Sequence, residues 1–246
     1  MSPSIGVIGL GRMAQALIEP LLTAGSIAPH QVTAVVGQPE SVAALQQSAF
    51  RQCVIHAAES AEAADVWAAP LQLLAIKPQQ VELAAASLPP VSGSPLLVSV
   101  LAGVNLSRLQ RLFPGHRVVR AVPNTPSLVG QGLTALAWGA NISPPQRQKV
   151  LQLFAGVGEV LELPEEKLDA FLALTSSGPA FVALVAEAMA DGAVAAGLPR
   201  DLAHRLAHRT LAGSAALLDQ RQLHPAMLKD MVTSPGGTTI AGVRAL

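Results

Sequence analysis

The residue types with the clearest chemical meaning lie at the start of the chain, where small residues follow a short apolar segment. Residues 5–8 are apolar, residues 9–14 have the spacing Gly-x-Gly-x-x-Ala, and a helix-forming stretch follows. In a strand–turn–helix unit, Gly9 permits the tight turn, Gly11 lets the backbone approach a pyrophosphate, and Ala14 lets the helix pack closely on the strand. The phosphates rest on free N–H groups at the positive end of the helix dipole. This segment predicts a dinucleotide-binding turn.

A second motif that could hold an anion lies near the other end of the chain. Residues 233–239 read Thr-Ser-Pro-Gly-Gly-Thr-Thr. A proline–glycine–glycine loop ahead of threonines is typical of backbone N–H groups gathered at a helix start, with hydroxyls beside them. This loop would suit a small carboxylate. A plain helix cap after a flexible turn is the alternative interpretation.

Three further segments place small or polar residues directly after apolar stretches. They are Lys77-Pro78, Val100–Gly103 and Pro123–Pro126. In a doubly wound sheet, ligands bind beyond the carboxyl ends of the strands, so all three segments fall on the cofactor side. Ordinary turns would also explain them: a solvated lysine, a tight turn at a glycine and a loop stiffened by two prolines.

A metal site is not expected. His204 and His208 lie four residues apart in a predicted helix, with an arginine after each of them. No third ligand joins them at a convincing spacing, so a polar helix face is the favoured interpretation. No Ser/His/Asp or Cys/His arrangement for nucleophilic catalysis emerges either.

The composition limits the function classes. Of 246 residues, 50% are apolar, 13% are charged and 3% are aromatic, with 16 basic and 16 acidic side chains. This balance argues against nucleic-acid binding by charge or by base stacking. Cys53 is the only cysteine, so no disulfide framework can form. The N-terminal apolar segment is too short for a signal peptide, and no stretch of about 18 apolar residues is uninterrupted. We expect a cytoplasmic protein with no nucleic-acid and no membrane partner.

The order of elements predicts two domains. Near-continuous apolar segments, as a buried parallel sheet requires, follow residues 5–8 at 32–36, 71–76, 96–100, 118–121 and 133–138. Helix-forming segments between them indicate a doubly wound α/β (Rossmann) domain over residues 1–163. From residue 164 the pattern is all-α, with helices expected at 164–174, 179–196, 199–218 and 225–232. These Ala-rich helices bury little alone, so we expect oligomerisation through them.

Taken together, the motifs make the chain resemble the pyrroline-5-carboxylate reductase family, whose members catalyse the last step of proline biosynthesis. The likeness covers nearly the whole chain, in family order and spacing, at residues 8–14, 74–79, 99–103, 120–126, 177–181 and 228–240. The last motif is close to diagnostic of the family, whereas the first is shared by many dehydrogenases. The resemblance implies hydride transfer from NAD(P)H to the cyclic imine 1-pyrroline-5-carboxylate, giving L-proline.

The resemblance also implies an assembly and a substrate site. The helical domain would interlock with that of a partner to form at least a homodimer, and in some members a larger ring. The loop formed by Ser234, Gly236, Gly237, Thr238 and Thr239 would bind the substrate, and it would come from the neighbouring subunit. Backbone N–H groups of Gly237 and Thr238 would hold the substrate carboxylate. The Thr239 hydroxyl would bond the ring nitrogen and act as the catalytic group.

The predicted cofactor is NADPH, with NADH as the alternative donor. The segment 32–36 ends without an Asp or Glu to bind the ribose 2′-hydroxyl, which favours NADPH, and Gln38 and Ser41 are the candidate contacts there. The full set of predicted cofactor-binding residues is Ile8, Gly9, Leu10, Gly11, Arg12, Met13, Gln38, Ser41, Ala75, Lys77, Pro78, Val100, Leu101, Ala102 and Asn124.

Some features depart from the family pattern and keep alternatives open. Pro70 stands where the family usually has Asp, Ser176 where it has Gly and Phe181 where it has Tyr, and the family normally continues beyond the position of Leu246. One alternative is a two-domain reductase of the 2-hydroxyacid or prephenate dehydrogenase type, which usually takes a Lys or His acid/base from its second domain. The other is a catalytically silent nucleotide-binding regulatory protein.

Overall fold

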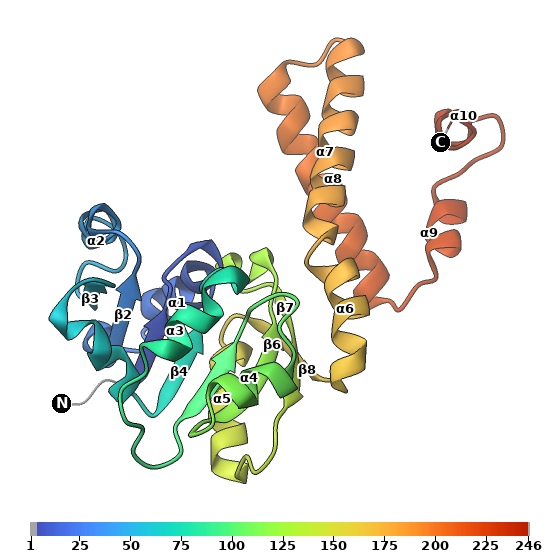
Figure 1. Ribbon diagram of the computed structural model, residues 1–246. Helices are drawn as coiled ribbons and strands as arrows, with labels where there is room; N and C mark the ends of the chain where they lie inside the picture. The colour runs from blue at the N-terminus through green and yellow to red at the C-terminus, as the bar shows by residue number, and fades with distance from the viewer. Residues whose placement is uncertain (1–3, 246) are drawn as a thin grey trace. The chain divides into compact units, whose positions relative to one another are not determined.

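A computed structural model describes residues 4–245, which divide by their contacts into an α/β unit ending at Pro179 and a helical unit beginning at Ala180. In the first unit, the described residues form one eight-stranded sheet in the order β3-β2-β1-β4-β5-β6-β7-β8 (Figure 1). The strands are β1 Ile5–Ile8, β2 Val32–Val36, β3 Val54–Ala57, β4 Leu71–Leu74, β5 Leu96–Ser99, β6 Arg117–Val122, β7 Gly132–Trp138 and β8 Gly158–Glu162. This arrangement confirms the predicted Rossmann-type domain.

The sheet differs from the prediction in one strand direction and in two additional strands. Strand β7 runs antiparallel to β6, and the other neighbouring strands pair in parallel. Strands β3 and β8 were not predicted. Both lie at an edge and are only partly buried, so their sequences lack the continuous apolar character of the central strands.

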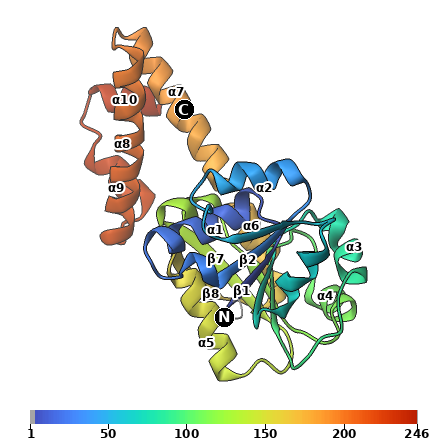
Figure 2. The same ribbon diagram turned by 90° about the vertical axis from the view of Figure 1, so that its left-hand side faces the viewer.

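Helices cover both faces of the sheet. Alternation along the strands sends Val7, Leu73 and Val98 to one face, and Ile8, Leu74 and Leu97 to the other. The first face packs against α1 Arg12–Thr23, α2 Pro39–Gln46 and α5 Pro144–Ala155, and the second against η2 Ala61–Ala68, α3 Val81–Ala86, α4 Leu106–Leu112 and α6 Leu168–Thr175. Figure 2 shows α3 and α4 across the sheet from α1 and α5. The remaining short 3₁₀ segments are η1 Pro29–Gln31, η3 Pro78–Gln80, η4 Thr125–Val129 and η5 Glu165–Lys167.

The predicted C-terminal helices are confirmed. They are α7 Gly178–Ala195, α8 Arg200–Gln220 and α9 Pro225–Met231, followed by the short α10 Thr238–Val243. Helices α7 and α8 lie side by side (Figure 1), because Ala190 packs against Ala203 and Ala207. Small side chains let the two helices approach closely but bury little apolar area. None of the residues of α9 and α10 is buried.

The contact boundary falls later than the change from strands to helices. Leu168 of α6 is buried against Val122, Ala135 and Ala137 of the sheet, so α6 packs with the α/β unit. The predicted boundary between residues 163 and 164 marks the change from strands to helices, and as a domain boundary it stays a prediction.

One apolar helical segment has much of its surface uncovered. Residues Glu165–Ala195 form, by length and composition alone, a helix that could cross a membrane, and only 11% of its apolar window is buried. Leu174, Phe181 and Leu184 are each more than 60% exposed. Such a surface needs a second apolar surface to cover it.

Candidate active site

The turn between β1 and α1 has the geometry that its glycines predict. Gly9 has φ +90°, and a Cβ at this position would lie 2.8 Å from Ile76 Cγ2 and 2.9 Å from the Ala75 oxygen. A side chain is therefore excluded by both conformation and space. Gly11 precedes α1 at the N-cap, and a Cβ there would meet nothing within 4 Å. Open space thus lies in front of a helix start that no side chain caps.

A cavity of about 550 Å³ lies beside this turn, at the carboxyl ends of β1, β2, β3 and β4. The predicted cofactor residues that line it are Ile8, Gly9, Leu10, Gly11, Ser41, Ala75 and Lys77. Its size is in the range of small-molecule and cofactor pockets. The structure thus brings together the glycine turn, the end of β2 and the end of β4.

One wall of this cavity was missed in the sequence. It is formed by residues that follow β3 and by α3, namely Ala58, Ser60, Ala61, Ala63, Ala64, Leu83, Ala84 and Ser87. Because β3 was not predicted, the segment after it could not be placed at the sheet edge. The Ser60 hydroxyl oxygen is buried there without a hydrogen-bond partner among the described residues. A ligand atom would satisfy such a group.

The charge of the cavity lining suits an anionic ligand. Lys77, which follows β4 and is exposed, is the charged residue in the cavity lining. No carboxylate of the described residues lines the cavity. A dinucleotide carries its negative charge on phosphates, so a lining without carboxylates avoids repulsion. The residues present therefore fit a phosphate-containing cofactor.

The other predicted cofactor residues do not line this cavity. Arg12 and Met13 lie in the first turn of α1, Gln38 caps α2 without a side-chain bond, and Pro78 begins η3. Val100, Leu101 and Ala102 follow β5, where Leu101 is buried and Ala102 is exposed. These residues lie at the carboxyl ends of neighbouring strands, and their contacts with a cofactor stay predictions.

The side chain of Asn124 is occupied inside the protein. Its amide group donates to the Thr175 carbonyl oxygen at 3.0 Å, and its oxygen accepts the Leu133 N–H at 2.8 Å. The residue is 5% exposed. The Asn124 side chain therefore ties the loop after β6 to the end of α6, and its contact with a cofactor stays a prediction.

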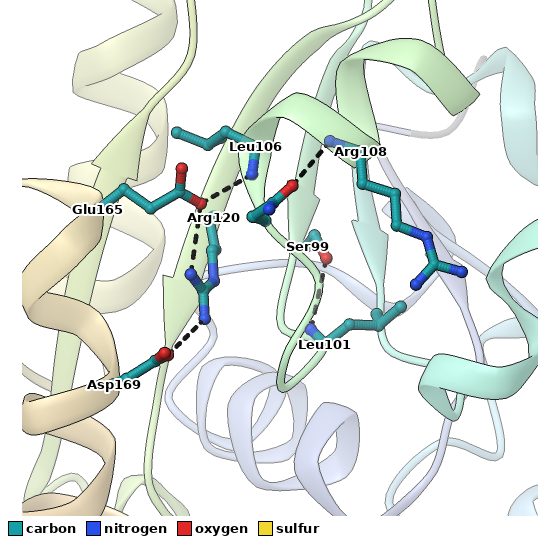
Figure 3. Close-up of polar contacts among 8 residues, drawn as sticks. Ser99, Leu101, Leu106, Arg108, Arg120, Glu165 and Asp169 are labelled. Atoms are coloured by element: carbon teal, nitrogen blue, oxygen red, sulfur yellow. Dashed lines mark hydrogen bonds and ion pairs between the residues drawn. The ribbon is translucent and has the colours of Figure 1, made fainter.

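A buried arginine paired with two more exposed carboxylates beside the loop after β5 was also missed (Figure 3). The Arg120 side chain is 5% exposed and donates to Glu165 Oε1 at 3.3 Å and to Asp169 Oδ1 at 3.0 Å. Glu165 Oε1 also accepts the backbone N–H of Leu106 at 2.7 Å. A single charged residue within an apolar strand segment was the signal that could have pointed to this cluster.

The loop near the C-terminus begins a helix, as predicted. Gly237 is the N-cap of α10, whose start has no side-chain cap. Gly236 has φ +68°, and the Gly237 N–H donates to the Ser234 oxygen at 3.1 Å. Thr238 and Thr239 are both exposed at the first turn. The Gly237 N–H is therefore already used, and the loop presents the backbone N–H groups and hydroxyls of Thr238 and Thr239 at the first turn of α10.

The histidine pair on α8 gains no further ligand. The rings of His204 and His208 are 6.2 Å apart. Among residues 4–245, no cluster of three or more His, Cys, Asp or Glu side chains could hold a metal ion.

Comparison with protein families matches the two parts of the chain separately. The family described as "Pyrroline-5-carboxylate reductase dimerisation" matches residues 165–246. The family described as "NADP oxidoreductase coenzyme F420-dependent" matches residues 4–103. The first match assigns the exposed apolar surface of α7 to a dimerisation domain.

Individual relatives match along the whole chain. Pyrroline-5-carboxylate reductase from Synechocystis is 44% identical over 100% of this chain and 90% of its own length. The enzyme of the same name from Escherichia coli is 38% identical, with the same coverage. The crystal structure of Plasmodium falciparum pyrroline carboxylate reductase with NADP bound aligns with a TM-score of 0.87 at 26% identity, over 99% of this chain and 89% of that one.

Proposed function

The chain belongs to the pyrroline-5-carboxylate reductase family, and from that premise we propose that it reduces 1-pyrroline-5-carboxylate to L-proline with NADPH in the cytoplasm. The observation that carries the proposal is the start of α10, where the backbone N–H groups of Thr238 and Thr239 have no partner within the helix and could bind a small carboxylate. The other element is the glycine turn and cavity at the carboxyl ends of the central strands.

NADPH is the proposed hydride donor, with NADH as a weaker one. The cavity lined by Ser41, Ser60 and Lys77 contains no described carboxylate, and a relative of this chain has NADP bound. Gln38 and Ser41 lie at or beside the tip of β2, where the ribose 2′ position is usually recognised. Without an arginine there, we expect the preference for NADPH over NADH to be modest.

The loop Ser234–Thr239 is proposed to orient the substrate. The N–H groups of Gly237 and Thr238 would hold the carboxylate, the Gly237 N–H exchanging its 3.1 Å bond to the Ser234 oxygen for one to the substrate. The Thr239 hydroxyl would bond the ring nitrogen. A cyclic imine protonated on nitrogen accepts hydride at carbon and becomes a secondary amine without further proton transfer. The protein therefore has to supply orientation and a dry pocket rather than a strong acid, which agrees with the absence of a predicted catalytic dyad.

A homodimer, and a larger ring built from it, is the proposed assembly. A dimerisation family matches residues 165–246, and Phe181 and Leu184 of α7 are 62% and 66% exposed. Covering them against a second copy would remove apolar surface from water. In the proposed assembly the substrate loop would come from the neighbouring subunit.

The test is NADPH consumption with 1-pyrroline-5-carboxylate, in the wild type and in Thr239→Ala and Thr239→Ser. We expect kcat to fall about tenfold or more in Thr239→Ala, the effect of one lost transition-state hydrogen bond. Thr239→Ser keeps the hydroxyl and should retain most of the activity. A wild type without turnover would refute the proposed reaction, whereas equal activity of Thr239→Ala and wild type would refute the role of this loop.

A further inference from the structure

The loop between β5 and α4 is fixed at both of its ends. At its start, the Ser99 hydroxyl oxygen accepts the Leu101 N–H at 3.4 Å. At its end, Glu165 Oε1 accepts the Leu106 N–H at 2.7 Å, and the Asn105 side chain caps α4. The close-up in Figure 3 shows Glu165 reaching this end of the loop from outside the α4 segment. The contact spans 59 positions in the sequence.

Glu165 is in turn held by Arg120. The guanidinium is almost fully buried beneath η5 and the start of α6, and it is 3.3 Å from the same Glu165 oxygen that binds Leu106. Arg120 also pairs in register with Ser99 across β5 and β6. The guanidinium also has Asp169 as a partner at 3.0 Å, but Asp169 is 84% exposed, so the more enclosed Glu165 remains restrained by the buried arginine.

The middle of the loop lacks such support. Ala102 and Gly103 are exposed, and Gly103 has φ +72° with open space around it. Leu101 anchors the loop through burial in the second core. Val104 is also buried there, at 1% exposure, so packing fixes the chain on either side of the exposed pair Ala102 and Gly103. The hydrogen bonds at the loop ends add to this by holding the chain where it enters α4.

We propose that Glu165 is a positioning residue for hydride transfer: held by Arg120, it fixes the start of α4 and, through it, the loop 100–105. In this proposal the predicted cofactor residues Val100, Leu101 and Ala102 of that loop lie against the nicotinamide. This inference rests on the proposed function. Glu165 lies at the start of the dimerisation segment, so the first turn of that segment sets the geometry of a loop in the nucleotide-binding part. Misplacing reacting groups by about 1 Å can lower a rate by roughly a hundredfold.

The test compares Glu165→Ala and Glu165→Gln with a matched control. Glu165→Gln keeps an oxygen that can accept the Leu106 N–H but loses the charge. The control is Glu82→Ala. The Glu82 carboxylate also pairs with an arginine, Arg108 of α4, at 2.9 Å, but in this pair both side chains are exposed. All variants are assayed for kcat, for the primary isotope effect with NADPH deuterated at the transferred position, and for binding of adenosine 2′,5′-bisphosphate.

We expect Glu165→Ala to lower kcat by about tenfold and to raise the isotope effect, because hydride transfer becomes slower when the nicotinamide is misplaced. Glu165→Gln should recover part of the rate, and Glu82→Ala should behave as wild type. Binding of adenosine 2′,5′-bisphosphate, which lacks the nicotinamide, should stay within about twofold in all variants.

Two results would overturn the inference while leaving the reductase activity of the wild type intact. One is unchanged kcat and isotope effect in Glu165→Ala. The other is an equal loss of adenosine 2′,5′-bisphosphate binding and of kcat, which would indicate general destabilisation. Absence of wild-type turnover would instead reject the reaction itself, so the two failures are distinguishable.

Discussion

The two predicted binding loops use the same device, a helix start preceded by glycine, but in different surroundings. The loop at Gly9 and Gly11 lies at the end of a central strand, and a Cβ on Gly9 would lie 2.9 Å from backbone atoms of Ala75 and Ile76. The loop at Gly236 and Gly237 precedes the six-residue α10, none of whose residues is buried. The first loop is held by the core of its own unit, whereas the second has few contacts within its own unit.

This difference indicates where each loop obtains its rigidity. A short helix is marginally stable in isolation, so an exposed substrate loop needs packing from elsewhere to hold a precise geometry. Residues 165–246 match a dimerisation family, and in the proposed dimer a second copy of the chain would supply this packing. Cofactor binding should therefore depend on the fold of the α/β unit, and substrate binding on assembly.

The largest effect is expected from Gly9→Ala. Its positive φ and a contact below 3 Å would combine backbone strain with overpacking, lowering the free energy of unfolding by about 3 kcal/mol and abolishing measurable NADPH binding. Thermal unfolding and fluorescence titration measure the two quantities. Gly11→Ala is the control: with open space around its Cβ, stability should fall by less than about 1 kcal/mol while NADPH affinity still drops. Equal stability of the two variants would contradict the close packing of the first loop.

A charge on the exposed face of α7 should affect the second loop without touching it. Phe181→Glu places a carboxylate on an apolar surface that we expect to be buried in the dimer, so it should shift the protein toward monomer and raise KM for the imine about tenfold or more. Sedimentation velocity and steady-state kinetics give the measurements. Affinity for NADPH should stay within about twofold, because the cavity belongs to the α/β unit. A monomer with normal KM would show that the loop needs no partner.

The same contrast explains what the sequence could predict. The glycine turn, the five later apolar strands and the C-terminal helices were predicted because each depends on local pattern: strand burial on both faces, glycine conformation and helix start and stop residues. The structure confirms these elements. The motif at residues 228–240 also led to the family that the comparisons show.

What the sequence could not give depends on contacts between distant segments. Strand β3 is an edge strand with one buried residue, so the cavity wall after it, including Ser60, was missed. Arg120, Glu165 and Leu106 lie far apart in the chain and meet only in the folded unit. Asn124 is predicted as a cofactor-binding residue from its place after β6, but the sequence could not show that its side chain binds Thr175 and Leu133, because a buried amide needs partners wherever the fold supplies them.

A smaller effect is expected from Gly236→Ala, which tests the second loop in the way that Gly9→Ala tests the first. Gly236 also has positive φ, +68°, but nothing lies within 4 Å of its Cβ position. Only backbone strain applies, about 1 kcal/mol, and an exposed loop can relax it. KM for the imine should rise by about threefold to tenfold, while the unfolding midpoint stays within error. A large loss of stability would mean that this loop is as tightly packed as the first.

The smallest effect is expected in the pH dependence of the free energy of unfolding. It concerns the α/β unit alone, through the buried His116. His116 is buried beside Trp67 and Phe113, and its Nε2 bonds Gln72 Oε1 at 2.9 Å. Burial lowers the pKa of His116 below its usual value. As pH falls through the ordinary pKa of histidine, His116 therefore takes up a proton in the unfolded chain but not in the folded chain. The free energy of unfolding declines over that pH range and below it. Chemical denaturation followed by tryptophan fluorescence reports this, because Trp67 and Trp138 both lie in the α/β unit.

His116→Gln offers the comparison for this titration. A glutamine amide can donate to Gln72 but cannot take up a proton, so the decline between neutral and mildly acidic pH should become shallower than in the wild type. The α/β unit of Phe181→Glu should show the wild-type pH dependence, because that substitution lies in the other unit. If His116→Gln keeps the full decline, another group of the α/β unit must bind the proton on unfolding. If the decline disappears in Phe181→Glu, the two units do not unfold independently, and the contrast between a self-supported cofactor loop and a partner-supported substrate loop would fail at its premise.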